Sequence, residues 1–238
     1  FLNSAKKADS AKEWAPSGFP KRVVGLPGMS TIVKYLARGA TCQLGEEIDQ
    51  IRKLSKGWLV ANQVYDRVIC AVPAPQAAKM LASQDLKKSL SGVVMAPRLT
   101  LMLAVPSSSE SHSTFFTPGN DVMSLALLDN AKTSRSGPRC WVAHATVDWS
   151  RSHLDLDKQA IAESLMPIVC DSIGCRMQDS LYVDAHKWRF ALTEKPLGRP
   201  FLTDGRGLFI GGDWTISDRA EAAWISGLAM ADAVLASS

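Results

Sequence analysis

Residues 207–214 read GLFIGGDW, and after a short polar turn residues 218–227 read DRAEAAWISG. An apolar run that ends in two glycines and an acid, with small residues beyond it, predicts a strand, a sharp turn and the N-terminus of a helix. Backbone N–H groups at a helix N-terminus favour an anion or a polar ring edge. The glycines let the backbone approach a ligand, and the carboxylate can accept hydrogen bonds from sugar-like hydroxyls. The same pattern also fits a well-capped strand-to-helix crossover that binds nothing, so both interpretations stay open.

The composition is that of an ordinary globular protein. The chain has 238 residues, of which 46% are hydrophobic and 21% charged, and its formal net charge is +4. This length suits one large or two modest domains. Lysines and arginines are scattered, so neither nucleic acid nor a membrane surface is expected as a partner. No apolar run reaches the roughly 18–20 residues that span a bilayer.

The cysteines favour a reducing compartment. They are Cys42, Cys70, Cys140, Cys170 and Cys175, an odd number without C-x-x-C spacing. This set argues against a disulfide framework and against a zinc site. Cys42, Cys70 and Cys140 lie in apolar runs, where buried, reduced thiols are expected. We therefore expect the cytoplasm or another reducing soluble compartment, while a lost organellar presequence stays open.

Short elements are predicted in the first third of the chain. Apolar residues at helical spacing predict a helix over 28–38. Turn signals separate three short runs that predict a strand meander, at 41–44, 47–54 and 58–61. The continuous apolar run 67–72 is typical of a strand buried on both faces.

The rest of the chain alternates strands with two longer helices. Strands are predicted at 98–105, 122–128, 140–146, 180–185, 187–191 and 205–211. A helix is predicted over 157–173, kinked or split by Pro167, and a last helix over 219–235. The pattern indicates two interleaved parts.

The longer string over 207–227 resembles the C-terminal flavin-binding signature of the FAD-dependent amine-oxidase superfamily, most closely its renalase-like branch. Segments that resemble other blocks of that family follow in its order: PKRVVGLPGM at 20–29, YDRVICAVPAPQAA at 65–78, WVAHATVDWSRSHL at 141–154 and HKWRFAL at 186–192. The resemblance implies a mixed α/β (α+β) fold, in which an incomplete FAD-binding Rossmann-like domain is interleaved with a mostly antiparallel substrate domain. The resemblance implies that residues 1–75 form the partial FAD-binding domain and residues 76–200 the substrate domain. Residues 201–238 return to the FAD-binding domain.

One family feature does not occur in this sequence. The family begins with a strand and a Gly-x-Gly-x-x-Gly loop that holds the FAD pyrophosphate, and no such triplet is found here. We therefore expect a family member that lacks its first nucleotide-binding βαβ unit, with a missing N-terminal segment as a partner. A fragment, a processed product and an incomplete gene model are equally compatible with this expectation.

The resemblance implies a set of cofactor-binding residues. Asp213 would accept a hydrogen bond from the ribityl chain of FAD, and Gly212 would let the backbone come close. The backbone of Ala220, Glu221 and Ala222 would meet the pyrimidine edge of the flavin, although the family usually has Gly where this chain has Ala222. Ile48 would lie near the adenine and Val72 near the cofactor; a core Ile and a domain-exit turn explain these two equally well. No Cys occurs in the signature, so FAD is expected to be noncovalent.

The resemblance also implies a substrate-side block at His186, Trp188 and Arg189. On a strand, alternation places His186 and Trp188 on one face and Arg189 on the other. Trp188 could wall the flavin pocket, and His186 or Arg189 could orient a polar substrate. A core Trp and a structural His are the alternatives. No metal is expected, because no Cys/His cluster is present.

These features imply an FAD-dependent oxidoreductase that moves a hydride from a reduced nicotinamide-type or amine-type donor, a small molecule, to flavin and then to oxygen. The alternative is a non-catalytic remnant or fragment that acts, if at all, as a binding module.

Overall fold

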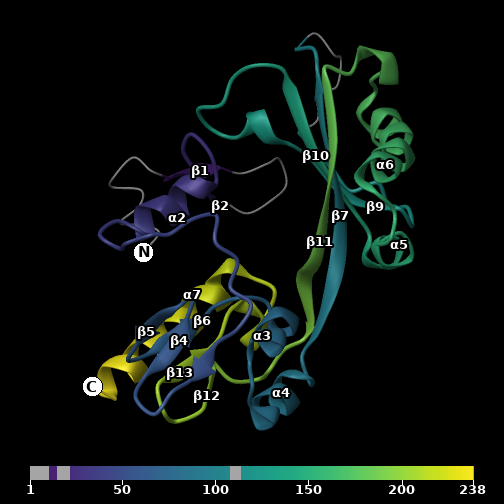
Figure 1. Cartoon of the computed structure of the whole chain (residues 1–238). Helices are drawn as coiled ribbons and strands as arrows, with labels where there is room; N and C mark the ends of the chain where they lie inside the picture. Colours follow the sequence, from purple (N-terminus) through teal and green to yellow (C-terminus); the bar gives the residue numbers. More distant parts are fainter. Residues whose placement is uncertain (1–10, 15–21, 108–113, 238) are drawn as a thin grey trace. The chain divides into compact units, whose positions relative to one another are not determined.

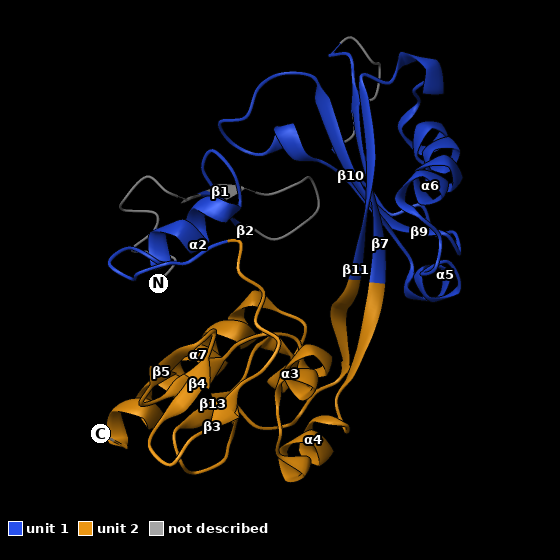
Figure 2. Ribbon diagram, in the orientation of Figure 1, with its two compact units in different colours: residues 1–44, 98–188 blue, residues 45–97, 189–238 orange. Residues whose placement is uncertain are grey.

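The structure is a computed structural model that describes residues 11–14, 22–107 and 114–237. It divides into two compact units, each made from two stretches of chain (Figure 2). Unit 1 comprises 1–44 and 98–188, and unit 2 comprises 45–97 and 189–238. The strands β7 (Val94–Val105) and β11 (Tyr182–Lys195) carry the chain from one unit into the other. The domain boundaries expected at residues 75 and 200 stay predictions.

Unit 1 is built on a five-stranded sheet in the order β11-β7-β10-β9-β8 (Figure 1). Its other strands are β8 (Phe115–Phe116), β9 (Met123–Leu128) and β10 (Arg139–Ala145). The pairs β10/β7, β10/β9 and β8/β9 are antiparallel, and β9 and β10 are neighbours as the sequence predicts. Alternation in β7 sends Leu99, Leu101 and Leu103 to one face, where all three are fully buried.

The helix α6 (Lys158–Ile173) covers that buried face. Its residues Ile161, Leu165 and Val169 share a core cluster with the β7 leucines. Asp157 caps the helix by accepting a hydrogen bond from the Ala160 amide (2.8 Å). The expected split at Pro167 is wrong, since the helix continues through it. The packing of the apolar residues on both sides of Pro167 outweighs the lost hydrogen bond.

Unit 1 has smaller elements as well. A short helix, α5 (Val147–Ser152), and two 3₁₀ turns, η1 (Asp129–Ala131) and η2 (Met177–Asp179), connect the strands. The N-terminal stretch forms an antiparallel pair, β1 (Ala11–Trp14) with β2 (Arg22–Gly25), followed by α2 (Ser30–Leu36). The helix predicted at 28–38 is therefore present, but none of the residues within α2 is buried.

Unit 2 contains two three-stranded sheets. In the first, β13 (Leu208–Ile210) pairs in parallel with β6 (Val68–Cys70) and antiparallel with β12 (Leu202–Thr203). The second is a meander of β3 (Arg52–Lys53), β4 (Trp58–Val60) and β5 (Gln63–Tyr65). β3 and β4 lie within two of the predicted runs, whereas β5 was not predicted. Its helices are α3 (Ala74–Met80), α4 (Gln84–Leu90) and α7 (Ala220–Ala236). A 3₁₀ turn, η3 (Asp213–Thr215), precedes α7.

Three expectations for the strands are corrected by the structure. The predicted strand at 41–44 is wrong, because residues 41–50 are irregular and Leu44 is exposed, so no apolar face holds it in a sheet. The strands predicted at 180–185 and 187–191 form the single strand β11. The run 67–72 is not buried on both faces: Ile69 in β6 is 47% exposed, because β6 is an edge strand of its described sheet.

Candidate functional site

The carboxyl ends of the two parallel strands in unit 2 meet at one edge of their sheet. Val72 lies two residues after β6, and Gly211 to Asp213 follow β13 directly. The Gly211 amide donates to the Cys70 carbonyl (3.1 Å), which extends the parallel ladder by one residue. Ligands of open α/β sheets bind outside the carboxyl ends of parallel strands. This edge, from Val72 and Gly211 to the start of α7, is called the β13–α7 loop site below.

Trp214 fixes the geometry of this site. Its indole Nε1 donates to the Val72 carbonyl (3.0 Å), and the Trp214 side chain is fully buried. The Leu197 amide donates in turn to the Trp214 carbonyl (3.2 Å). The two strand ends are therefore held together by a side chain and not only by the sheet. Trp214 was not among the predicted site residues; its place directly after the Gly-Gly-Asp run is the signal that could have indicated it.

The two glycines of the run are required by packing. A Cβ atom at Gly211 would meet the side chains of Ser226 and Met230, so Gly211 lets α7 approach the sheet. A Cβ atom at Gly212 would lie 2.7 Å from Trp214 Nε1, and Gly212 has a φ of +152°. Ser226 Oγ accepts from the Gly212 amide (3.0 Å) and donates to the Pro200 carbonyl (2.7 Å), which ties α7 to the loop.

Asp213 is the first residue of η3, the turn that leads to α7. Its Oδ1 accepts from the Trp214 amide (2.8 Å), and its side chain is half-buried, so part of the residue remains accessible to a ligand. Asp213 caps neither η3 nor α7, so the helix-cap alternative is not confirmed, and the carboxylate can accept further hydrogen bonds.

The N-terminus of α7 provides amides beside this carboxylate. Ala220 and Glu221 are exposed, whereas Ala222 is buried and its amide already donates to the Arg219 carbonyl (3.0 Å). The outward donors of the first helical turn are therefore those of Ala220 and Glu221. A flavin fits these groups chemically: acceptors for hydroxyls at Asp213, donors for a polar ring edge at the helix start, and a backbone free of side chains at Gly212.

The remaining predicted cofactor residue lies elsewhere in unit 2. Ile48 is half-buried in the irregular segment before β3, three residues ahead of Ile51, whose amide donates to the Met80 carbonyl (2.9 Å). Its assignment to the adenine side of FAD stays a prediction.

The substrate-side block lies on β11. The rings of His186 and Trp188 have centroids 4.2 Å apart, so these side chains share one face of the strand as alternation predicts. Trp188 is 52% exposed, which argues against the alternative of a core tryptophan. His186 and Trp188 belong to unit 1 and Arg189 to unit 2, and their roles stay predictions.

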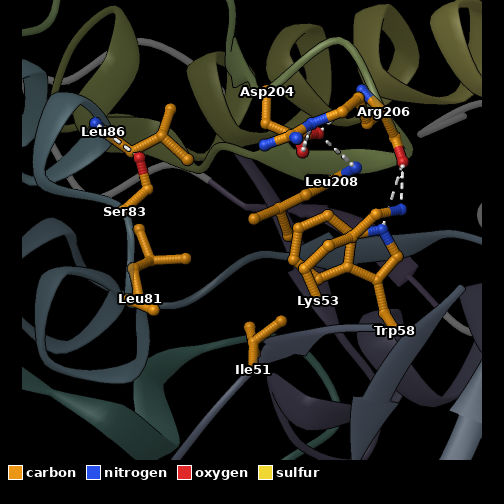
Figure 3. Close-up of a pocket in the computed structure, with 10 residues that line it drawn as sticks. Ile51, Lys53, Trp58, Leu81, Ser83, Leu86, Asp204, Arg206 and Leu208 are labelled. Atoms are coloured by element: carbon orange, nitrogen blue, oxygen red, sulfur yellow. Dashed lines mark hydrogen bonds and ion pairs between the residues drawn. The ribbon is translucent and has the colours of Figure 1, made fainter. Parts of the chain in front are cut away.

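A separate cavity of about 280 Å³ lies at the opposite end of β13 (Figure 3). Leu208, at the amino end of this strand, lines it together with Ile51, Leu81 and Leu86. Lys53 Nζ and Trp58 Nε1 both donate to the Arg206 carbonyl, at 3.0 and 3.3 Å. Asp204 accepts from the Leu208 amide (3.0 Å) and pairs with the Arg206 guanidinium (3.3 Å). Its polar groups bind one another, and no predicted site residue lines it, so it is not assigned to the cofactor.

The cysteines do not form a metal site. All five are free thiols; Cys70 and Cys170 are buried, but Cys42 is exposed, so the expectation of burial is wrong for Cys42, which lies in the irregular segment before β3. Among the described residues, no group of three or more His, Cys, Asp or Glu side chains could hold a metal ion. None of the helices in the described ranges is both long and apolar enough to cross a bilayer.

The parallel strand ends, the glycine–acid turn and the helix N-terminus form the kind of edge at which open α/β proteins bind ligands. The family model for flavin-containing amine oxidoreductases matches residues 3–235, and the chain belongs to that family. Solved structures share its fold. A structure from Exiguobacterium sp. 255-15, assigned as a protoporphyrinogen oxidase, is 13% identical with a TM-score of 0.68 over 93% of this chain and 53% of its own. Putrescine oxidase bound to putrescine is 12% identical with a TM-score of 0.62 over 90% of this chain and 54% of its own.

These findings confirm the FAD-dependent amine-oxidase superfamily, the mixed α/β fold and FAD as the cofactor of the family. The chain spans about half the length of the solved structures that it resembles.

Proposed function

We propose that this chain forms part of an FAD-dependent oxidoreductase of the renalase-like type. The overall reaction takes a hydride from a reduced nicotinamide-type or amine-type donor and delivers its two electrons to oxygen. The observation that supports this function is the β13–α7 loop site, where the Trp214–Val72 hydrogen bond joins the ends of two parallel strands and Ser226 of α7 bonds the loop. FAD supplies the hydride-accepting ring when it is bound.

The residues of the loop site bind and orient the cofactor in this proposal. Asp213 accepts a hydrogen bond from the ribityl chain, and Gly212 gives the backbone access. The amides of Ala220 and Glu221, with the positive end of α7, stabilise negative charge at the pyrimidine edge. Val72, Ile48 and the backbone of Ala222 contact the cofactor, and the attachment is noncovalent.

His186, Trp188 and Arg189 contribute the substrate side. Trp188 presents an exposed aromatic surface against which a planar donor can stack. His186 and Arg189 orient its polar groups. The substrate is a small molecule.

We infer that a further polypeptide segment completes the cofactor site. The described β6 is an edge strand with Ile69 exposed, and the solved relatives are about twice as long as this chain. α7 also exposes the large apolar side chains Trp224, Leu228 and Leu235 along one face. Apolar surface of this extent is a feature of interfaces. A nucleotide-binding βαβ unit paired with β6 would cover Ile69 and supply the pyrophosphate contacts. The same exposed surface supports the second candidate, a remnant that acts as a binding module.

The test is the intact mass and the visible absorbance of the protein purified from its native source, where we propose a reducing soluble compartment. A mass well above 25.8 kDa with flavin bands is expected. A mass of 25.8 kDa without flavin, even after FAD is added, would support the remnant and contradict the enzyme.

A further inference from the structure

The face of the unit 1 sheet that points away from α6 carries a group of hydrogen-bond donors. Thr100 on β7 lies opposite His144 on β10, and Thr100 Oγ1 is 2.8 Å from His144 Nδ1. Arg98 shares this face by alternation along β7. Lys132 and Arg135, in the segment between β9 and β10, belong to the same group and both pair with Asp129. We propose that this group, called the basic face, binds an oxyanion of the substrate, a carboxylate or a phosphate.

The charges of Lys132 and Arg135 are not balanced by the carboxylate with which they pair. Lys132 and Arg135 share the single carboxylate of Asp129, and the side chains of both cations are only 11% exposed. Burial lowers the pKa of Lys132 and of Arg135. Buried positive charge is costly unless an anion compensates it, and one carboxylate does not compensate two cations.

The pKa of His144 is affected by the same positive charges. Burial, and after it the nearby charges of Arg98 and Lys132, lower its pKa to about 4. His144 is therefore neutral near pH 7. If Thr100 donates to Nδ1, the proton of the neutral ring lies on Nε2, which is then a donor for a ligand.

Two further donors are available at Arg135. Its Nε and Nη2 atoms are buried and have no hydrogen-bond partner among the described residues. Buried donors of this kind call for an acceptor such as water or an ion. The planar guanidinium matches a carboxylate or phosphate in two-point geometry.

This inference rests on the proposed function in one respect: the ligand of the basic face is taken to be the electron donor of the reaction. The basic face favours an electron donor that carries an oxyanion. It disfavours a diamine, because the positive charges of the amines and of the basic face repel each other in a partly buried site. The basic face thereby distinguishes between the two donor classes of the proposed function.

Binding of small probes to the full chain, measured by calorimetry, tests the inference without flavin. The probes are inorganic pyrophosphate, a dicarboxylate (glutarate) and a diamine (putrescine). The variants are Lys132→Gln, the conservative Lys132→Arg, and Lys158→Gln as a charge-matched control on the exposed start of α6. We expect the wild type to bind one of the two anions. Lys132→Gln should bind that anion about tenfold to hundredfold more weakly, whereas Lys132→Arg and Lys158→Gln should keep the wild-type affinity.

A second measurement follows the His144 imidazole by NMR, assigned with His144→Gln. A saturating anion raises the pKa of His144, because it offsets the charges of Arg98 and Lys132. Equal anion binding by Lys132→Gln, preferential binding of putrescine, or a His144 pKa that the anion leaves unchanged would each overturn the inference. Anion binding by the full chain, together with no flavin in the protein purified from its native source even after FAD is added, would contradict the proposed function alone.

Discussion

Asp213 and His144 show how neighbouring groups decide what a side chain can do. Asp213 uses one carboxylate oxygen to hold the Trp214 amide and stays half-buried, so it can still accept from a ligand. His144 is held by Thr100 beside two positive charges and is therefore neutral. Both residues take their properties from their surroundings and not from their type alone.

The stability of the protein depends on pH through His144. Its pKa is lowered in the folded state, so the unfolded chain binds more protons between about pH 4 and 6.5, and the free energy of unfolding rises with pH over that range. The contribution is roughly 3 kcal/mol at most at neutral pH. Urea unfolding at several pH values should show a shallower rise for His144→Gln than for the wild type. An unchanged slope would contradict the burial of a neutral His144.

The cysteines should differ in their reactivity. Burial raises the pKa of Cys170 to about 12, with a further contribution from the Cys175 thiol, and burial also raises the pKa of Cys70. Because the thiolate is the reactive form, iodoacetamide at pH 8 should modify the exposed Cys42 first and leave Cys70 and Cys170 unmodified. Peptide mass spectrometry measures this, with a urea-denatured sample in which all five react as the control. Early modification of Cys170 would show that α6 opens readily.

At the scale of elements, the β13–α7 connection depends on close packing. The helix approaches the sheet because Gly211 has no side chain, and Ser226 fastens it to the loop through two hydrogen bonds. One of these bonds holds the Gly212 amide, directly before Asp213. Gly211 and Ser226 therefore determine both the packing of α7 and the shape of the proposed cofactor site.

A pair of glycine substitutions separates packing from backbone effects. Gly211→Ala should lower the free energy of unfolding by about 1–3 kcal/mol, since the added methyl group meets Ser226 and Met230. Gly227→Ala, inside α7 with open space around it, should raise the free energy of unfolding by up to about 1 kcal/mol. Urea denaturation measures both. If Gly211→Ala is as stable as the wild type, α7 does not pack as described.

The proline in α6 offers a test of the helix. Pro167 is exposed and lies between the buried residues Leu165 and Val169. Pro167→Ala restores a backbone donor and removes a ring that crowds the preceding turn, so the free energy of unfolding should rise by about 1–3 kcal/mol. A calorimetric melt with a higher midpoint would agree with one continuous helix. A lower midpoint would mean that the bend at Pro167 is needed for packing.

At the scale of the whole molecule, the elements that depend on local sequence patterns could be predicted. The contacts between residues far apart in the sequence could not. The strand–turn–helix at 207–227 and α6 follow from apolar spacing, capping residues and glycines. The pairing of β6 with β13 could not be predicted from the residues alone, because more than half of the sequence separates the two strands. The Trp214–Val72 bond and the Thr100–His144 pair depend on such contacts, and both were missed.

Part of the site could be predicted because it is contiguous. Gly212, Asp213 and the start of α7 lie within ten residues of one another, so one stretch of sequence describes them. Arg98, Lys132 and His144 are spread over three segments and show no pattern in the sequence. The exposure of Ile69 is a property of the sheet edge, which periodicity does not reveal.

The affinity of the protein for FAD in an Asp213→Ala variant tests the central claim most directly. Titration of the full protein, followed by flavin fluorescence, compares it with the wild type and with Asp232→Ala, a control on the exposed face of α7. We predict that Asp213→Ala weakens FAD binding by about tenfold or more, as expected for a hydrogen bond to a charged acceptor, while Asp232→Ala binds as the wild type does. Unchanged affinity in Asp213→Ala would contradict the assignment of the β13–α7 loop as the flavin site.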